Sequence, residues 1–313
     1  MLVVAGWLVL NRQYVSDQVI VWAYTPTAQI TSIEERVGFT EKGKFYFYAT
    51  QPEVAYGNSF NQQCPRQEVG SPILGCYTNG RTYIFDVTNE QLDGIEEVTA
   101  VHEMLHAAWE RLSTNERQRL GDLLRQQFSS LDDEELKTRI AYYERTEPGQ
   151  TDNELHSILG TEVGQLSDEL EEYYSQYVNE RAAVLALHDS YDGLFTSLSD
   201  TVNTLYDELT SLEEKINNNT EEYNSSSNVL SAEIDDFNAR AENNGFTSEA
   251  QFNQERAALV ARSSQLDDGR ATINNDIASY NRIYARYQDA ASQIEVLNKS
   301  IDSFEVLEPS PSL

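Results

Sequence analysis

The chain of 313 residues carries 52 aspartates and glutamates against 22 lysines and arginines, which gives a formal net charge of -30. Such a charge repels phosphate, so a nucleic-acid-binding surface is excluded and anionic membranes are disfavoured, whereas basic peptides and divalent ions are suitable partners. The length allows two domains, and with 40% hydrophobic residues the chain can form a core.

Residues 1–10, MLVVAGWLVL, form an uninterrupted apolar run. The run is shorter than the roughly 20 apolar residues that span a bilayer. It also lacks the basic leader and the small-residue cleavage site of a signal peptide. We therefore interpret residues 1–15 as an apolar N-terminal segment, which is either the remnant of a membrane anchor or a buried first strand.

Residues 16–87 predict a small sheet with one helix. The predicted elements are a strand at Gln18–Tyr24, a helix at Ala28–Val37, a strand at Lys44–Thr50, and a hairpin of strands at Leu74–Thr78 and Arg81–Val87. The aromatic-rich stretch at Lys44–Thr50 gives the strongest strand signal in the chain. Asn79-Gly80 is a favoured two-residue hairpin turn because both positions accept positive φ. Most of the stretch between the second strand and the hairpin is expected to be irregular.

The two cysteines, Cys64 and Cys76, lie close together in the sequence. They do not form a Cys-x-x-Cys pair, so a structural zinc knuckle is not expected. An even count over a short loop favours a disulfide, which implies an oxidising compartment. Together with the apolar N-terminal segment, this predicts an extracellular or cell-surface protein; two free thiols in a cytosolic protein are the alternative.

The segment Val98–Trp109 contains His-Glu-x-x-His, formed by His102, Glu103 and His106. Apolar residues three and four apart around the motif predict a helix with a buried face. Residues four apart share one face of a helix, so His102 and His106 can hold one metal ion together. Glu103 lies one step round the helix and can act as the general base on a water molecule. This spacing indicates a zinc hydrolase, with a pair of structural histidines as the simpler alternative.

Three further helices are predicted after the motif, at residues 114–128, 132–144 and 151–162. Ser113 and Glu116 form the signature of a capping box before the first of them. The third is expected to close at Gly160, because glycine commonly ends helices.

From residue 167 onward no strand is predicted, and apolar residues repeat in heptads. The first series is Leu198, Val202, Leu205, Leu209, Leu212 and Ile216, continued by Tyr223, Leu230, Ile234 and Phe237. After a turn at Asn243–Gly245, the second series is Ile273, Ile277, Tyr280, Tyr284, Tyr287, Ala291, Ile294, Ile301 and Phe304. Alternating spacings of four and three predict a coiled coil. Residues 167–305 are therefore expected to form a long antiparallel helical hairpin, with residues 306–313 as a tail.

On the five residues of its His-Glu-x-x-His motif, the sequence resembles the zincin metallopeptidases over residues 16–166. The resemblance implies an α+β fold, bound zinc, a peptide or protein substrate and a third protein ligand. No histidine follows at the metzincin spacing, so the gluzincin type, which uses a glutamate from a later helix, is the closer pattern. Asn153-Glu154 is similar to the Asn-Glu pair of that type, which makes Glu154 the preferred ligand.

Two other residues, Glu162 and His156, remain alternative ligands, because side-chain direction decides the matter. Thr151 and Glu154 also have the spacing of a capping box, which would give Glu154 a structural role. The acidic residue that the family carries a few positions further on is absent, since Ser157 and Ile158 stand there.

The function expected from this pattern is zinc-dependent peptide hydrolysis with Glu103 as general base. Candidate donors to the developing oxyanion are Tyr142, Tyr143, Tyr173 and Tyr174. The alternative is a non-catalytic extracellular protein of zincin-like fold whose coiled-coil arm binds a protein partner or a second copy of the chain.

Overall fold

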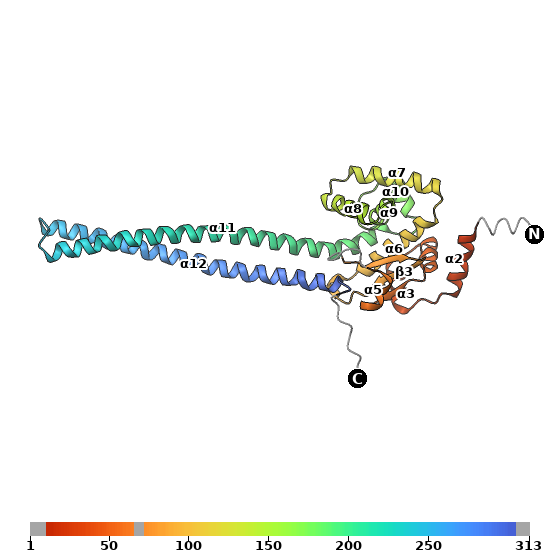
Figure 1. Cartoon of the computed structure of the whole chain (residues 1–313), viewed down its shortest axis with the longest axis horizontal. Helices are drawn as coiled ribbons and strands as arrows, with labels where there is room; N and C mark the ends of the chain where they lie inside the picture. Colours follow the sequence, from red (N-terminus) through yellow and green to blue (C-terminus); the bar gives the residue numbers. More distant parts are fainter. Residues whose placement is uncertain (1–10, 66–71, 305–313) are drawn as a thin grey trace, which may run out of the picture. The chain divides into compact units, whose positions relative to one another are not determined.

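The computed structural model describes residues 11–65 and 72–304, so the apolar run at residues 1–10 and the tail at 305–313 lie outside the described residues. The chain divides into two compact units (Figure 1). The first unit comprises residues 1–195 and 295–313, and the second comprises residues 196–294. The boundary expected at residue 167 therefore lies about thirty residues later.

Over its described residues up to 85, the first unit has four helices and three short strands. They are α2 (Arg12–Ala23), α3 (Ala28–Val37), α4 (Glu41–Ala49), β1 (Glu53–Ala55), α5 (Gly57–Gln63), β2 (Gly75–Thr78) and β3 (Arg81–Phe85). The predicted helix at residues 28–37 and the predicted hairpin are confirmed. The two strands predicted at residues 18–24 and 44–50 are wrong, because both stretches are helical. Part of the stretch expected to be irregular forms β1 and α5.

The aromatic composition of α4 favours a strand. The segment is nevertheless helical, because a capping hydrogen bond and tertiary packing stabilise the helix. The side chain of Thr40 caps it by accepting a hydrogen bond from the Gly43 amide. Gly43 and Phe47, four residues apart, are both buried. A Cβ on Gly43 would lie 2.0 Å from the carbonyl oxygen of Tyr177, so this face of the helix packs against backbone. Aromatic residues favour strands only where a half-buried pleated surface is available to them.

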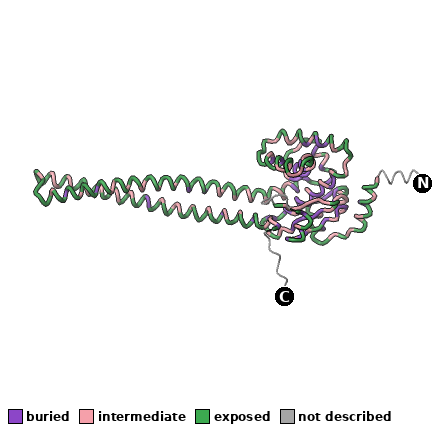
Figure 2. The backbone as a smooth tube through the Cα atoms, in the orientation of Figure 1, coloured by how far each residue is buried: buried purple, intermediate pink, exposed green. Residues whose placement is uncertain are grey.

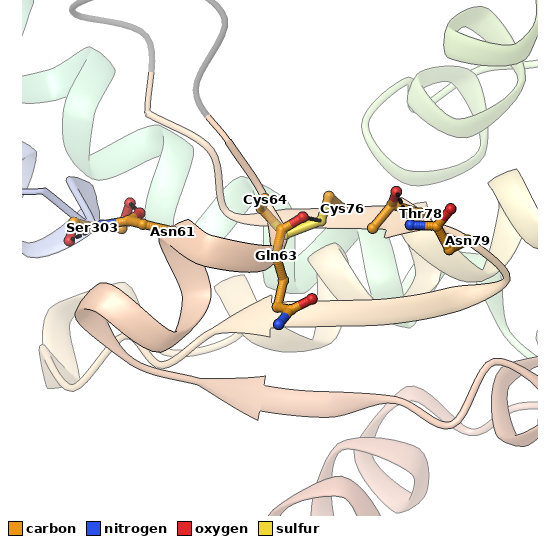
Figure 3. The surroundings of a disulfide bond; sticks show 7 residues. All are labelled: Asn61, Gln63, Cys64, Cys76, Thr78, Asn79 and Ser303. Atoms are coloured by element: carbon orange, nitrogen blue, oxygen red, sulfur yellow. Dashed lines mark hydrogen bonds between the residues drawn. A yellow bond between two sulfur atoms is a disulfide. The ribbon is translucent and has the colours of Figure 1, made fainter.

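The sheet has the order β1-β3-β2, with β1 parallel and β2 antiparallel to β3. Asn79 and Gly80 both have positive φ, 51° and 76°, as their turn requires. The predicted disulfide is confirmed: Cys64, at the end of α5, is bonded to Cys76 in β2 (Figure 3). In the same region the Asn61 side chain donates to the carbonyl oxygen of Ser303, which ties α5 to the last residues of the described chain (Figure 3).

A short 3-10 helix, η1 (Glu90–Leu92), and a series of α-helices follow in the first unit. They are α6 (Ile95–Arg111), α7 (Thr114–Ser130), α8 (Glu134–Thr146), α9 (Thr151–Thr161) and α10 (Asp168–Tyr174). Helix α6 is central, since it packs against α3, α4, α9, β2 and β3. The capping box of Ser113 and Glu116 is confirmed at the start of α7. Beyond α10, Tyr177 and Val178 are buried in the same core, so these residues belong to the first unit.

The predicted helical hairpin is confirmed in α11 (Arg181–Glu242) and α12 (Glu249–Ile301). The first series of heptad residues faces α12, with Leu205, Leu209, Leu230 and Phe237 buried. The second series is only partly correct, because Ile277 and Tyr284 are exposed while Ala290 and Leu297 are buried. Among the described residues, no helix combines the length and the apolar character needed to cross a membrane.

Three predicted seam positions of α12, Ile277, Tyr284 and Ala291, lie one residue after the more buried ones, Asp276, Ile283 and Ala290, and a polar residue accounts only for the first of these shifts. Half-buried or buried positions recur at spacings of three and four along the helix and include Glu255, Arg262 and Asp276. Glu255 pairs with Arg240, Arg262 with Glu233, and Asp276 with Lys215, all across the hairpin. A search for apolar residues alone passes over such positions.

Candidate metal centre

Helix α6 brings the two motif histidines together, and α9 adds a carboxylate. The ring centroids of His102 and His106 are 4.8 Å apart. The Oε2 atom of Glu154 lies 3.9 Å from His102 Nε2, and its Oε1 atom lies 3.6 Å from His106 Nε2. One ligand atom from each residue lies within 4.8 Å of the others, so this half-buried group could hold a metal ion. Two imidazoles and one carboxylate are a donor set that suits catalytic zinc, which keeps a fourth position open.

Helix α9 also orients one of the imidazoles. Asn153 Oδ1 lies 3.0 Å from His106 Nδ1, and Ser157 Oγ lies 3.2 Å from the same nitrogen. With the Nδ1 proton directed to Asn153, His106 Nε2 presents its lone pair towards Glu154. This partner of a ligand histidine is one that sequence reasoning missed, although Asn153 precedes the preferred ligand directly.

The capping-box alternative for Glu154 is not formed. Helix α9 has Gln150 at its N-cap, without a side-chain hydrogen bond, so Thr151 is already a helical residue. The Glu154 side chain is instead buried against the histidines. Burial raises its pKa to about 8, and the negative charge of Glu147 acts in the same direction. A cation would relieve both effects, because it favours the ionised carboxylate.

Glu103 is buried beneath strand β2. A Cβ on Gly75 would lie 2.9 Å from Glu103 Oε1, so the absence of a side chain at Gly75 leaves room for the carboxyl group. Burial raises the pKa of Glu103 to about 7. A carboxyl group that titrates near neutral pH can both accept and return a proton.

Burial also keeps His102 neutral. Its pKa is well below the usual value, because the buried charged form is disfavoured and His106 lies beside it. A histidine must be neutral to bind a metal, so the lowered pKa favours a ligand role at physiological pH.

The two alternative ligands lie elsewhere. Glu162 forms an ion pair with Arg139 and lies 3.8 Å from His188 Nε2. His156 is fully buried in a ring cluster with Trp109, Tyr173 and Tyr174. The structure therefore brings Glu154, and neither of these two residues, to the histidine pair.

Of the candidate donor tyrosines, Tyr143 interacts electrostatically with Glu154 and Glu103. Its pKa is raised by burial and by the charges of Glu154 and Glu103, whereas Arg139 opposes the rise. Tyr173 and Tyr174 pack around His156 instead, and the Tyr174 hydroxyl donates to the His156 carbonyl at 2.7 Å. Arg139 was not predicted as part of this environment, yet it lies four residues before Tyr143 and thus on the same face of α8.

Comparison with known proteins identifies no relative: no family model, no curated protein and no solved structure matches the chain.

Proposed function

We propose that the chain is a zinc-dependent peptidase with a gluzincin-like site, acting on peptide or protein substrates outside the cytoplasm. The observation that carries the proposal is the convergence of His102, His106 and Glu154 within 4.8 Å, on two different helices. The buried carboxyl group of Glu103 lies on the same helix as the two histidines. The Cys64–Cys76 disulfide supports an oxidising location.

Each residue of the site has a role in this proposal. When bound, zinc supplies Lewis acidity that polarises the scissile carbonyl and a water molecule. Glu103 takes the proton of the attacking water on its carboxylate and passes it to the leaving amine nitrogen. The Tyr143 hydroxyl donates a hydrogen bond to the carbonyl oxygen as negative charge develops there.

The test separates metal binding from catalysis. Purified wild-type protein should contain one zinc per chain and hydrolyse casein, whereas His106→Ala should contain none. Glu103→Gln should retain the metal and lose about 10²–10⁴-fold in activity, the usual contribution of a general base. Glu154→Gln should lose zinc, and the matched Glu162→Gln, which changes the alternative ligand, should keep it.

If zinc-loaded wild-type protein does not hydrolyse casein, the proposed peptidase activity is contradicted and the non-catalytic alternative is favoured. Full activity in Glu103→Gln would contradict the proposed base. Retention of zinc by Glu154→Gln together with its loss in Glu162→Gln would contradict the ligand assignment.

A further inference from the structure

Helix α2 carries exposed apolar side chains on one side. Val19 and Trp22 are exposed to 60% and 89% respectively, and Val15, one turn before Val19, is half-buried. These three residues are spaced by four and three positions, so they form one stripe along the helix. Tyr14 lies outside the stripe, because its ring packs against Phe45 of α4 at a centroid distance of 5.7 Å. We call Val15, Val19 and Trp22 the α2 face; Figure 2 shows the helix as largely exposed or half-buried.

The opposite side of α2 is fixed to the metal-site unit. Asp17 is buried and receives two hydrogen bonds, at 2.8 and 2.9 Å, from the guanidinium group of Arg111 at the end of α6. At the end of the helix, the Tyr24 hydroxyl donates to the carbonyl oxygen of Pro52 at 2.6 Å. These contacts fix the rotation of α2 about its own axis, so the α2 face points away from the unit.

The charge of the N-terminal region differs from that of the rest of the chain. Residues 1–33 contain only two charged side chains, Arg12 and Asp17, in a protein with 52 acidic residues. Asp17 is the one acidic residue among them, and it is buried in its pair with Arg111. The surface of α2 is therefore free of exposed acidic groups, although the chain as a whole has a net charge of -30.

We propose that the α2 face lies in the headgroup region of a lipid bilayer with uncharged headgroups and holds the metal-site unit at that surface. Tryptophan favours this region because its ring is both apolar and polar. In the sequence, ten apolar residues, 1–10, precede α2, and additional apolar residues strengthen binding to a lipid surface. A lipid surface accommodates both stretches without requiring a complementary protein shape. The inference is independent of whether the metal site hydrolyses peptides.

Vesicle binding by the full chain tests the proposal. Wild-type protein should float with phosphatidylcholine vesicles, and Val19→Ser/Trp22→Ser should reduce the partition coefficient at least about tenfold, since two apolar side chains no longer leave water. The matched control is Tyr206→Ser/Val260→Ser, which removes two residues exposed to 60% and 61% on the hairpin and should bind like wild type. Phosphatidylglycerol in the vesicles should weaken binding by charge repulsion.

Fluorescence locates the contact. In Trp7→Phe protein the remaining tryptophans are Trp22 and Trp109. Brominated phosphatidylcholine should quench the Trp22 share of the emission, obtained by subtracting the spectrum of Trp7→Phe/Trp22→Phe protein. Vesicle binding with unquenched Trp22 would overturn the proposal, because another segment would then make the contact. Absence of vesicle binding, with a wild-type dimer that dissociates in Val19→Ser/Trp22→Ser, would overturn it in favour of a second copy of the chain.

Discussion

Asn153 determines which nitrogen of His106 faces the candidate ligand group. Its Oδ1 atom lies 3.0 Å from His106 Nδ1 and holds the proton there. We predict that Asn153→Ala weakens zinc binding about tenfold, the lower end of the effect usual for such partners. The loss is limited because Ser157 Oγ, at 3.2 Å from the same nitrogen, retains part of the restraint. Competition with a chromophoric chelator measures the affinity.

Asn153→Asp is the matched control, since aspartate keeps an oxygen acceptor at the same place and should bind zinc at least as tightly as wild type. The prediction is wrong if alanine and aspartate weaken binding equally, or if alanine has no effect.

The residues of the site were predictable to different degrees for a physical reason. His102, Glu103 and His106 lie on one helix, where spacing alone determines which side chains share a face. The third candidate ligand lies on another helix, and its selection depends on the rotation of α9 against α6. That rotation turns Glu154 towards the histidines and His156 into the cluster around Trp109. No local pattern encodes it, so Glu154, Glu162 and His156 remained alternatives.

At the scale of elements, Gly160 sets how closely α9 approaches α6. A Cβ there would lie 2.5 Å from Leu105 Cδ1 and 2.8 Å from Tyr174 Cε1, and both of these side chains are buried. We predict that Gly160→Ala destabilises the protein by about 1 kcal/mol, because overpacking costs more than the helix propensity gained. Zinc affinity should fall as well, because Leu105 is adjacent to His106. Urea unfolding and zinc competition measure the two effects.

Gly193 supplies the control for this substitution. It lies inside α11, and a Cβ there would meet no atom within 4 Å. Gly193→Ala should therefore stabilise the protein by up to about 1 kcal/mol and leave zinc binding unchanged. If Gly160→Ala and Gly193→Ala stabilised the protein equally, a Cβ at residue 160 would fit between α9 and α6, and the predicted overpacking would be wrong.

Helix α9 was predicted correctly from the sequence, but the role predicted for Gly160 was wrong. We expected Gly160 to end the helix, yet the helix continues to Thr161 and the glycine allows close packing. The missed helices α2 and α4 have a related cause. Short apolar runs suit strands and buried helix segments alike. Tertiary contacts, such as Asp17 with Arg111 and Gly43 with the Tyr177 carbonyl, decide between them.

At the scale of the whole molecule, every residue assigned to the metal centre lies in the first unit, while the second unit is a pair of helices in heptad register. Three ion pairs mark that register along the hairpin, Lys215 with Asp276, Glu233 with Arg262, and Arg240 with Glu255. In each pair the α12 residue is half-buried, and polar residues placed in a coiled-coil seam tend to specify one alignment of the helices. The arm should therefore tolerate a change of length only if both helices change together.

We predict that deleting residues 203–209 and 284–290 together, one heptad from each helix, preserves helicity by circular dichroism and leaves zinc affinity within about twofold of wild type. Deleting 203–209 alone leaves the three ion pairs, which lie between the deletion and the turn, in register. It shifts the part of α11 before residue 203 by about 10 Å, at 1.5 Å per residue, against its partners in α12 after residue 290. That variant should lose helicity or melt at a markedly lower temperature.

The double-deletion variant also distinguishes between two possible roles of the helical hairpin formed by α11 and α12, which we call the arm. If the arm is a spacer, the double deletion should hydrolyse casein and a short peptide at unchanged rates. If the arm presents substrate, casein hydrolysis should fall while hydrolysis of the short peptide stays constant, because only the larger substrate can contact both units at once. Since the ligands and Glu103 all lie within residues 102–154, we expect the peptide rate to be unchanged in either case. A fall in the peptide rate would mean that the arm supports the metal centre itself.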